Sequence, residues 1–378
     1  MRLRFIHVLC SLFLVFDACV EPFDVPLPDN RGYIVVDGLI SDQPGPYNIR
    51  LFRPSSLSDQ LTTVDWITRA SLTIKDDQGN AYTLAEATPG NYQTPANFQG
   101  TVGRTYTLQI SISDNEQYES VPQTMLPVGE IEKVYYEFDQ EQSAQEANMT
   151  DDPKNGFTIY LDGKVLPEQN KLVRWRTSGT FEILTYPQDK QTAESGPRGT
   201  IVMVPAPPPC SGFRYNSRTS SLTRVGDCTC CTCWPTLYDK TPLLSNPKFL
   251  NSDEVVHQKL AFVPANRAYF RNKYYFQVEQ MSVTPEAYTF WNVIRKQEGS
   301  GSDLFQTPAA RTSGNMQPVG DTQTPIIGLF GVSAIRQYSF FIDRSEVPYS
   351  LLPMNVVEES CVLAPFGNST NVKPIFWQ

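Results

Sequence analysis

The run from Thr105 to Ser113, TYTLQISIS, constrains the fold of this chain more than any other segment. Its apolar residues stand at every second position, and the positions between them hold threonine, glutamine and serine. Successive side chains of a β-strand point to opposite faces, so this alternation puts one face on a core and the other in water. The run therefore predicts a half-buried strand, whose core face carries Tyr106, Leu108, Ile110 and Ile112.

Similar short strand patterns, separated by turn signals, occur through the first third of the chain. Residues 33–40 read YIVVDGLI, and residues 70–84 read as two strands around an Asp-Gln-Gly-Asn turn. Several such strands at close spacing, without a helical period, are typical of an immunoglobulin-like β-sandwich. We expect this sandwich to span residues 32–128 and to end where Pro127 and Gly129 interrupt the pattern.

The remaining residues, 129–378, are predicted to form a larger second domain that is also mainly β. Segments such as 157–163 and 273–283 are rich in aromatic and β-branched residues, which favour strands. The predicted fold class is therefore all-β and mainly antiparallel, with one or two helices in the second domain.

One helix is predicted after Thr284, because a threonine suits the N-cap and Pro285 suits the first helical position. An apolar stripe at helical spacing follows, and Gly299 is expected to close the helix. We expect this stripe to pack into the core of the second domain. Its residues are Ala287, Phe290, Trp291 and Ile294.

The chain begins with the pattern of a secretory signal peptide, predicted over residues 1–18. Two arginines precede an apolar run over 5–16, which is shorter than the roughly 20 residues that a spanning helix needs. Ala18 precedes Cys19, the position at which a bacterial lipoprotein is cleaved and acylated, and a proline-rich acidic spacer follows over 19–31. We therefore predict a lipid anchor on Cys19. Asp17 departs from the usual lipobox, so simple secretion or an uncleaved anchor are the alternatives.

The stretch CTCCTCW, residues 228–234, holds four of the six cysteines that follow Cys19. In a cytosolic chain this spacing would favour zinc or an iron–sulfur cluster, but behind a signal peptide it favours disulfides. Cys230 and Cys231 are adjacent, so we expect each to reach elsewhere, for example to Cys210 and Cys361. The prediction is an irregular insertion over 205–250, fastened by disulfides and without metal. The six candidates are Cys210, Cys228, Cys230, Cys231, Cys233 and Cys361.

Charge and histidine content exclude several functions. The formal net charge of -9 argues against a nucleic-acid partner, since phosphates require a basic surface. His257 is the one histidine after the signal peptide and lies in no nucleophile motif, which disfavours a Ser-His-Asp triad. The chain also lacks a phosphate loop, a dinucleotide fingerprint and an HExxH motif. We predict no catalytic residues and no cofactor. A glycan hydrolase needs only two carboxylates, and it stays an alternative.

Tryptophans are the candidate contact residues, because a flat aromatic side chain offers a large contact area to sugars and to protein partners. Trp66, Trp234 and Trp377 lie in loop-like or terminal settings and are predicted to contribute to a binding surface. Trp175 and Trp291 lie in strand and helix patterns, and we expect them in the core.

Several motifs resemble the DUF4249 family of Bacteroidota lipoproteins. They are a Glu-Ala-Tyr-x-Phe-Trp helix at 286–291, the strand IIGLFGVSAI at 326–335 and the closing Lys-Pro-x-Phe-Trp at 373–377. YIVVDGLI fits the same family pattern, so the resemblance covers nearly the whole mature chain. Ala364 stands where the family pattern has a second cysteine after Cys361.

The resemblance implies an outer-membrane lipoprotein that works beside a TonB-dependent transporter of the SusC-like kind. Glu21 and Asp24, next to the anchor, resemble the signal that sends such lipoproteins to the cell surface. The expected function is a non-catalytic binding or accessory component of that uptake system. The alternatives are an interaction lipoprotein of another cell-envelope complex and a glycan-acting hydrolase.

Overall fold

The structure is a computed structural model that describes residues 32–54, 64–113, 116–140, 155–166, 170–246, 253–300, 314–351, 356–363 and 368–377. These residues are mostly strand, with one α-helix, α2 (Pro285–Ser300), and several antiparallel sheets. The predicted fold class is confirmed. Cys19 and the signal peptide lie outside the described residues. No helix in the described ranges has the length and apolar character that a bilayer crossing requires.

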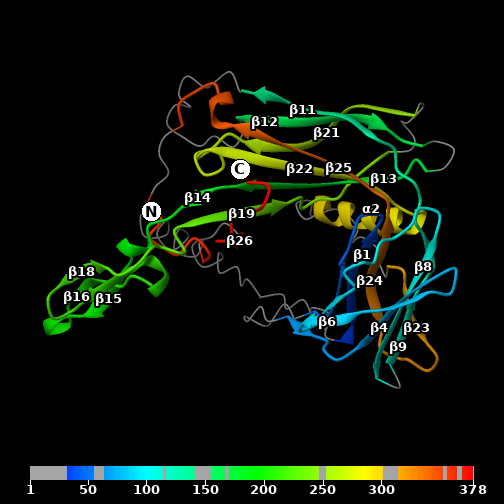
Figure 1. Ribbon diagram of the computed structural model, residues 1–378, viewed down its shortest axis with the longest axis horizontal. Helices are drawn as coiled ribbons and strands as arrows, with labels where there is room; N and C mark the ends of the chain where they lie inside the picture. The colour runs from blue at the N-terminus through cyan, green and yellow to red at the C-terminus, as the bar shows by residue number, and fades with distance from the viewer. Residues whose placement is uncertain are drawn as a thin grey trace, which may run out of the picture.

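The first lobe, at the lower right of Figure 1, is built from two sheets whose apolar faces share one core. One sheet has the order β24-β1-β2-β7-β6, with β3 beside β2. Its strands are β1 (Ile34–Ser41), β2 (Asn48–Arg53), β3 (Asp65–Trp66), β6 (Ala85–Thr88), β7 (Asn91–Gln93) and β24 (Ile326–Ser333). The other has the order β23-β9-β8-β4-β5, with β10 beside β8. Its strands are β4 (Ser71–Asp76), β5 (Ala81–Thr83), β8 (Thr105–Ser113), β9 (Glu116–Ser120), β10 (Gln123–Thr124) and β23 (Met316–Val319).

Strand β8 has the bounds that the alternating run predicts. Tyr106, Leu108 and Ile110 are buried, and Ile112, near the end of the strand, is half-buried. Its core face meets residues of the other sheet such as Ile49 in one apolar cluster. Sandwich-like packing of two sheets follows from this alternation.

Two strands from the second half of the chain complete the first lobe. β24 pairs in parallel with β1 along its whole length, from Ile34 opposite Ile326 to Ser41 opposite Ser333, and β23 pairs with β9. Residues 316–333, which the sequence places in the second domain, therefore extend the sheets expected to end at residue 128. Local patterning identifies a strand but not its partner, and a parallel pair is joined by a long connection.

The second lobe, at the top of Figure 1, holds a three-stranded and a seven-stranded antiparallel sheet. The three-stranded sheet consists of β11 (Ile131–Asp139), β12 (Gly156–Lys164) and β21 (Glu254–Pro264). The larger sheet has the order β14-β19-β13-β22-β25, with β20 beside β13 and β26 beside β19. Its strands are β13 (Val173–Phe181), β14 (Ile183–Leu184), β19 (Thr232–Tyr238), β20 (Leu243–Leu244), β22 (Lys273–Ser282), β25 (Ile335–Asp343) and β26 (Ser369–Thr370).

Helix α2 lies between the two lobes (Figure 1). Thr284 caps it as expected, since its hydroxyl accepts a hydrogen bond from the backbone N–H of Ala287 at 3.3 Å. Ala287 is buried, but Phe290, Trp291 and Ile294 are only half-buried. Phe290 and Trp291 still pack against the apolar cluster that contains Ala287, as expected, and Ile294 is the one stripe residue outside that cluster.

A narrow arm, residues 187–231, projects from the second lobe at the lower left of Figure 1. It consists of two hairpins and three short 3-10 turns. The hairpins are formed by β15 (Gln191–Ser195) with β16 (Ile201–Pro205) and by β17 (Phe213–Asn216) with β18 (Ser221–Arg224). The arm begins before the predicted insertion over 205–250, and residues 232–238 and 243–244 of that range form β19 and β20 of the large sheet.

The six candidate cysteines all form disulfides, which confirms the disulfide prediction. Cys210 is bonded to Cys230 and Cys228 to Cys231, and both bonds lie at the base of the arm. The third bond joins Cys233 of β19 to Cys361, which is 128 positions later in the sequence. Cys361 thus pairs with Cys233, not with one of the adjacent pair.

Candidate functional site

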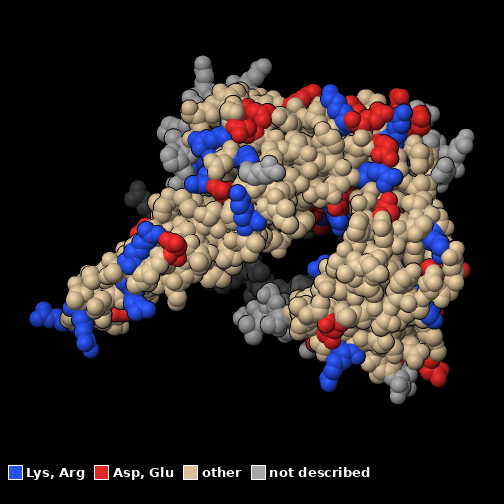
Figure 2. Space-filling view, viewed as in Figure 1, with Lys and Arg blue, Asp and Glu red and all other residues tan. Residues whose placement is uncertain are grey.

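A cleft of about 1040 Å³ lies between the two lobes. One wall comes from β1, β2 and the turn between β6 and β7, and the other comes from β13, β19, β22 and β25. Figure 2 shows the molecule hollowed at this boundary. Ligand sites are concave and commonly lie between domains, so this cleft is the first candidate for a binding site.

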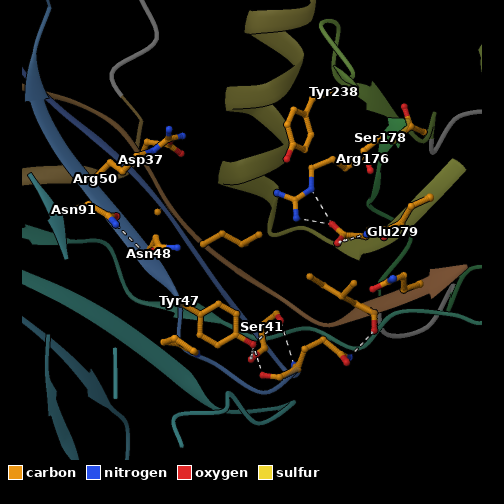
Figure 3. Close-up of a pocket in the computed structure, with 18 of the residues that line it drawn as sticks. Asp37, Ser41, Tyr47, Asn48, Arg50, Asn91, Arg176, Ser178, Tyr238 and Glu279 are labelled. Atoms are coloured by element: carbon orange, nitrogen blue, oxygen red, sulfur yellow. Dashed lines mark hydrogen bonds and ion pairs between the residues drawn. The ribbon is translucent and has the colours of Figure 1, made fainter. Parts of the chain in front are cut away.

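Each wall of the cleft carries one ion pair between directly opposed residues of neighbouring strands. Asp37 faces Arg50 across β1 and β2, and their side chains form a salt bridge. Arg176 faces Glu279 across β13 and β22, with its Nε donating to Oε2 of the glutamate at 2.8 Å. Figure 3 shows these pairs on the two walls. Both carboxylates in the cleft are therefore compensated by an arginine.

Side-chain amides add neutral hydrogen-bonding groups to the first wall. Oδ1 of Asn48 accepts hydrogen bonds from Nδ2 of Asn91 at 3.1 Å and from Nε2 of Gln93 at 3.0 Å. Oδ1 of Asn91 is buried and has no hydrogen-bond partner among the described residues. A buried acceptor without a partner is costly, so a ligand donor that reached it would be favoured.

Trp66 is the sequence-predicted contact residue that does line the cleft, and 38% of its surface is exposed. It packs edge-on against Phe52, with ring centroids 5.7 Å apart. Gly90 leaves room for the indole, because a Cβ there would lie 2.7 Å from the Trp66 ring. The Glu86 carboxylate accepts hydrogen bonds from the backbone N–H groups of Arg69 and Gly90, which holds the backbone on both sides of Trp66 in place. These bonds lower the pKa of the Glu86 carboxyl.

Tyr238 supplies an exposed aromatic side chain on the opposite wall (Figure 3). Tyr47 lies deeper, and its hydroxyl is 2.9 Å from that of Ser41. Burial raises the pKa of the Tyr47 hydroxyl, so it stays protonated near neutral pH. The cleft thus combines aromatic faces with hydroxyl and amide groups.

The other two predicted contact tryptophans are buried, which corrects that expectation. Trp234 is 8% exposed and Trp377 is 5% exposed, and together with Tyr275 they form a small apolar cluster. β26 causes this burial, because it pairs with β19 at Trp234 opposite Thr370 and brings the C-terminal segment back over the sheet. Trp175 is buried as expected, and its indole N–H donates to Gln280 at 2.8 Å.

His257 lies outside the cleft, on an irregular part of β21, and its backbone φ is +54°. Its ring stacks on Tyr160 with centroids 3.9 Å apart, and its Nδ1 is 2.9 Å from the hydroxyl of Tyr135. No cluster of three or more His, Cys, Asp or Glu side chains in the described part of the chain is placed to hold a metal ion.

Sequence reasoning missed most of the cleft residues. Asp37, Arg50, Arg176 and Glu279 were not singled out, because each is one polar residue in a strand pattern and its partner lies on another strand. The available signal was Asp37 itself, a carboxylate in the middle of the apolar run YIVVDGLI.

The fold and the cleft define a two-lobed, mainly β protein with a candidate binding site between its lobes. The chain belongs to the DUF4249 family, described as a domain of unknown function, whose sequence profile matches residues 20–339. No curated protein shows a significant match to the chain.

Proposed function

We propose that this chain is a lipid-anchored outer-membrane protein that serves as a non-catalytic binding component of a TonB-dependent, SusC-like uptake system. The observation that carries the proposal is the cleft of about 1040 Å³ with compensated charges and exposed aromatic side chains. Such a site suits recognition of a polar ligand. Its amides and hydroxyls can orient the ligand through hydrogen bonds, and Trp66 and Tyr238 offer a large contact area.

The pairing of the cleft carboxylates favours binding over hydrolysis. A glycosidase needs two carboxyl groups that exchange protons or attack the sugar. Asp37 is engaged by Arg50, and Glu279 accepts hydrogen bonds from Arg176 and, at 3.3 Å, from Gln277. Release of reducing sugar from a polysaccharide by the purified chain would favour the hydrolase instead.

The arm is the proposed contact surface for the transporter. On β16, Ile201 and Met203 point to the same face and are 77% and 55% exposed. The arm holds five basic and three acidic residues, a formal excess of two positive charges in a chain of net charge -9. Figure 2 shows Lys and Arg side chains gathered at its outer end. Exposed apolar side chains beside basic ones are typical of a protein contact, and they fit another envelope partner equally well.

We expect an Ile201→Ser, Met203→Ser double variant to lose most of the transporter that co-purifies with the detergent-extracted wild-type protein. The serines remove apolar area that a partner would cover, without touching the core. The matched control is Val256→Ser, which replaces a 71% exposed residue on β21 of the second lobe. Equal recovery of the transporter with the double variant and the wild type would contradict the arm contact.

The proposed anchor gives a separate prediction. The intact mass of the mature protein should begin at Cys19 and include a diacylglycerol group, and Cys19→Ala should abolish both the lipid and the cleavage before residue 19. A mass without lipid would favour simple secretion, whereas retention of residues 1–18 would favour an uncleaved anchor.

A further inference from the structure

A second cavity of about 380 Å³ adjoins the cleft beneath α2. We call it the inner chamber. It shares Asp37, Gly38, Leu39 and Arg176 with the lining of the cleft, so the two spaces meet at β1 and β13. A ligand in the cleft therefore has the inner chamber beside it.

The wall of the inner chamber is mainly apolar. Phe290, Trp291 and Ile294 of α2 line it, which accounts for their incomplete burial. Gly328, Leu329 and Gly331 of β24 also line the chamber. The stripe predicted as core is thus in part the wall of a cavity, and its apolar surface is available to the apolar part of a ligand.

Arg174 is the basic residue of the inner chamber whose donors are least satisfied. Its guanidinium lies 3.6 Å from the centre of the Trp291 ring. Its nearest carboxylate, Asp239, is 3.9 Å away, and its Nε is buried with no hydrogen-bond partner in the described part of the chain. Burial lowers the pKa of Arg174 to about 10, so it is still charged at neutral pH. Arg176, by contrast, donates to Glu279.

A guanidinium offers five N–H donors in a planar fork that matches a carboxylate. Asp239 is held by the backbone N–H of Thr177 at 3.1 Å, and Asp37 by Arg50. Neither carboxylate supplies a close hydrogen bond to Arg174. A ligand carboxylate would accept hydrogen bonds from Arg174, whereas a purely apolar ligand would leave its N–H donors without an acceptor.

We propose that the inner chamber binds an amphipathic acid, with its apolar part against α2 and its carboxylate on Arg174. This inference deepens the proposed function and rests on it, because it names the class of ligand that the binding component would take. A sugar would satisfy Arg174 but would leave the apolar wall uncovered. An amphipathic acid would both satisfy Arg174 and cover the apolar wall.

Titration calorimetry of the mature chain with decanoate and with decanol tests the proposal. These probes share their apolar part and differ in the charged group. We expect decanoate to bind at least about tenfold more tightly, since a charge-assisted hydrogen bond has roughly twice the strength of a neutral one. Equal affinity for the acid and the alcohol would overturn the proposal.

Two variants separate the contributions of charge and shape. Arg174→Gln should bring the affinity for decanoate close to that for decanol, and Ile294→Trp should weaken both by filling the cavity. Arg218→Gln, on the exposed part of the arm, is the matched control and should bind like the wild type. Thermal unfolding verifies that each variant is folded, and undiminished acid preference in folded Arg174→Gln would contradict the assignment. If the chain co-purified with the transporter but did not prefer the acid, acid binding in the inner chamber would be refuted and the proposed function would stand.

Discussion

Replacing Cys233 and Cys361 together by alanine is expected to lower the free energy of unfolding by about 5 kcal/mol. Their disulfide closes the longest loop of the three, with a sequence separation of 128. Loss of the bond lets the unfolded chain sample far more conformations, and this effect grows with loop length. Both cysteines are fully buried, so the smaller alanine side chains also leave a small gap in the core.

The matched control is the Cys228→Ala, Cys231→Ala double variant. Its disulfide spans a separation of only 3 and closes a small loop, so the same reasoning gives a loss of about 2 kcal/mol. Guanidinium denaturation under non-reducing conditions, followed by circular dichroism, measures both. Equal losses in the two double variants would show that loop length does not set the contribution of these bonds.

The second large effect is expected at Gly328, where β24 lies against β1. The backbone φ of Gly328 is +110°, and a Cβ at this position would lie 1.9 Å from the carbonyl oxygen of Val36. Gly328→Ala must therefore displace the parallel β1–β24 pairing, and we expect a loss of about 3 kcal/mol or more in the free energy of unfolding. Chemical denaturation of the mature chain measures it.

Gly320→Ala is the control for backbone conformation alone. Gly320 also has a positive φ, +62°, but a Cβ there would meet nothing within 4 Å. We expect this variant to lose about 1 kcal/mol. If both alanine variants lost the same amount, the close approach of β24 to β1 would not be a determinant of stability.

The parts of the fold that follow from local chemistry were predictable. The alternation over 105–113 defines β8, and the sequence around Thr284 defines the start of α2. Disulfides follow from six cysteines behind a predicted signal peptide, but their pairing does not, since Cys233 and Cys361 meet only in the folded chain.

What sequence could not reveal depends on contacts between distant residues. In the pairing of β24 with β1, Ile34 lies opposite Ile326, which is 292 positions later in the sequence. No local pattern encodes this pairing. The same limit applies to the cleft, where Arg176 meets Glu279 across two strands. Trp377 reads as a terminal residue, yet the segment that carries it folds back and is buried.

The central claim is that this chain is a binding partner of an outer-membrane transporter. The most direct measurement is purification of the tagged full-length protein in mild detergent from the cells that produce it, followed by mass spectrometry of the proteins that elute with it. We predict an acylated mature chain together with a TonB-dependent barrel in near-equal amounts. Elution of the chain alone, or with an envelope complex that contains no such barrel, would contradict the claim.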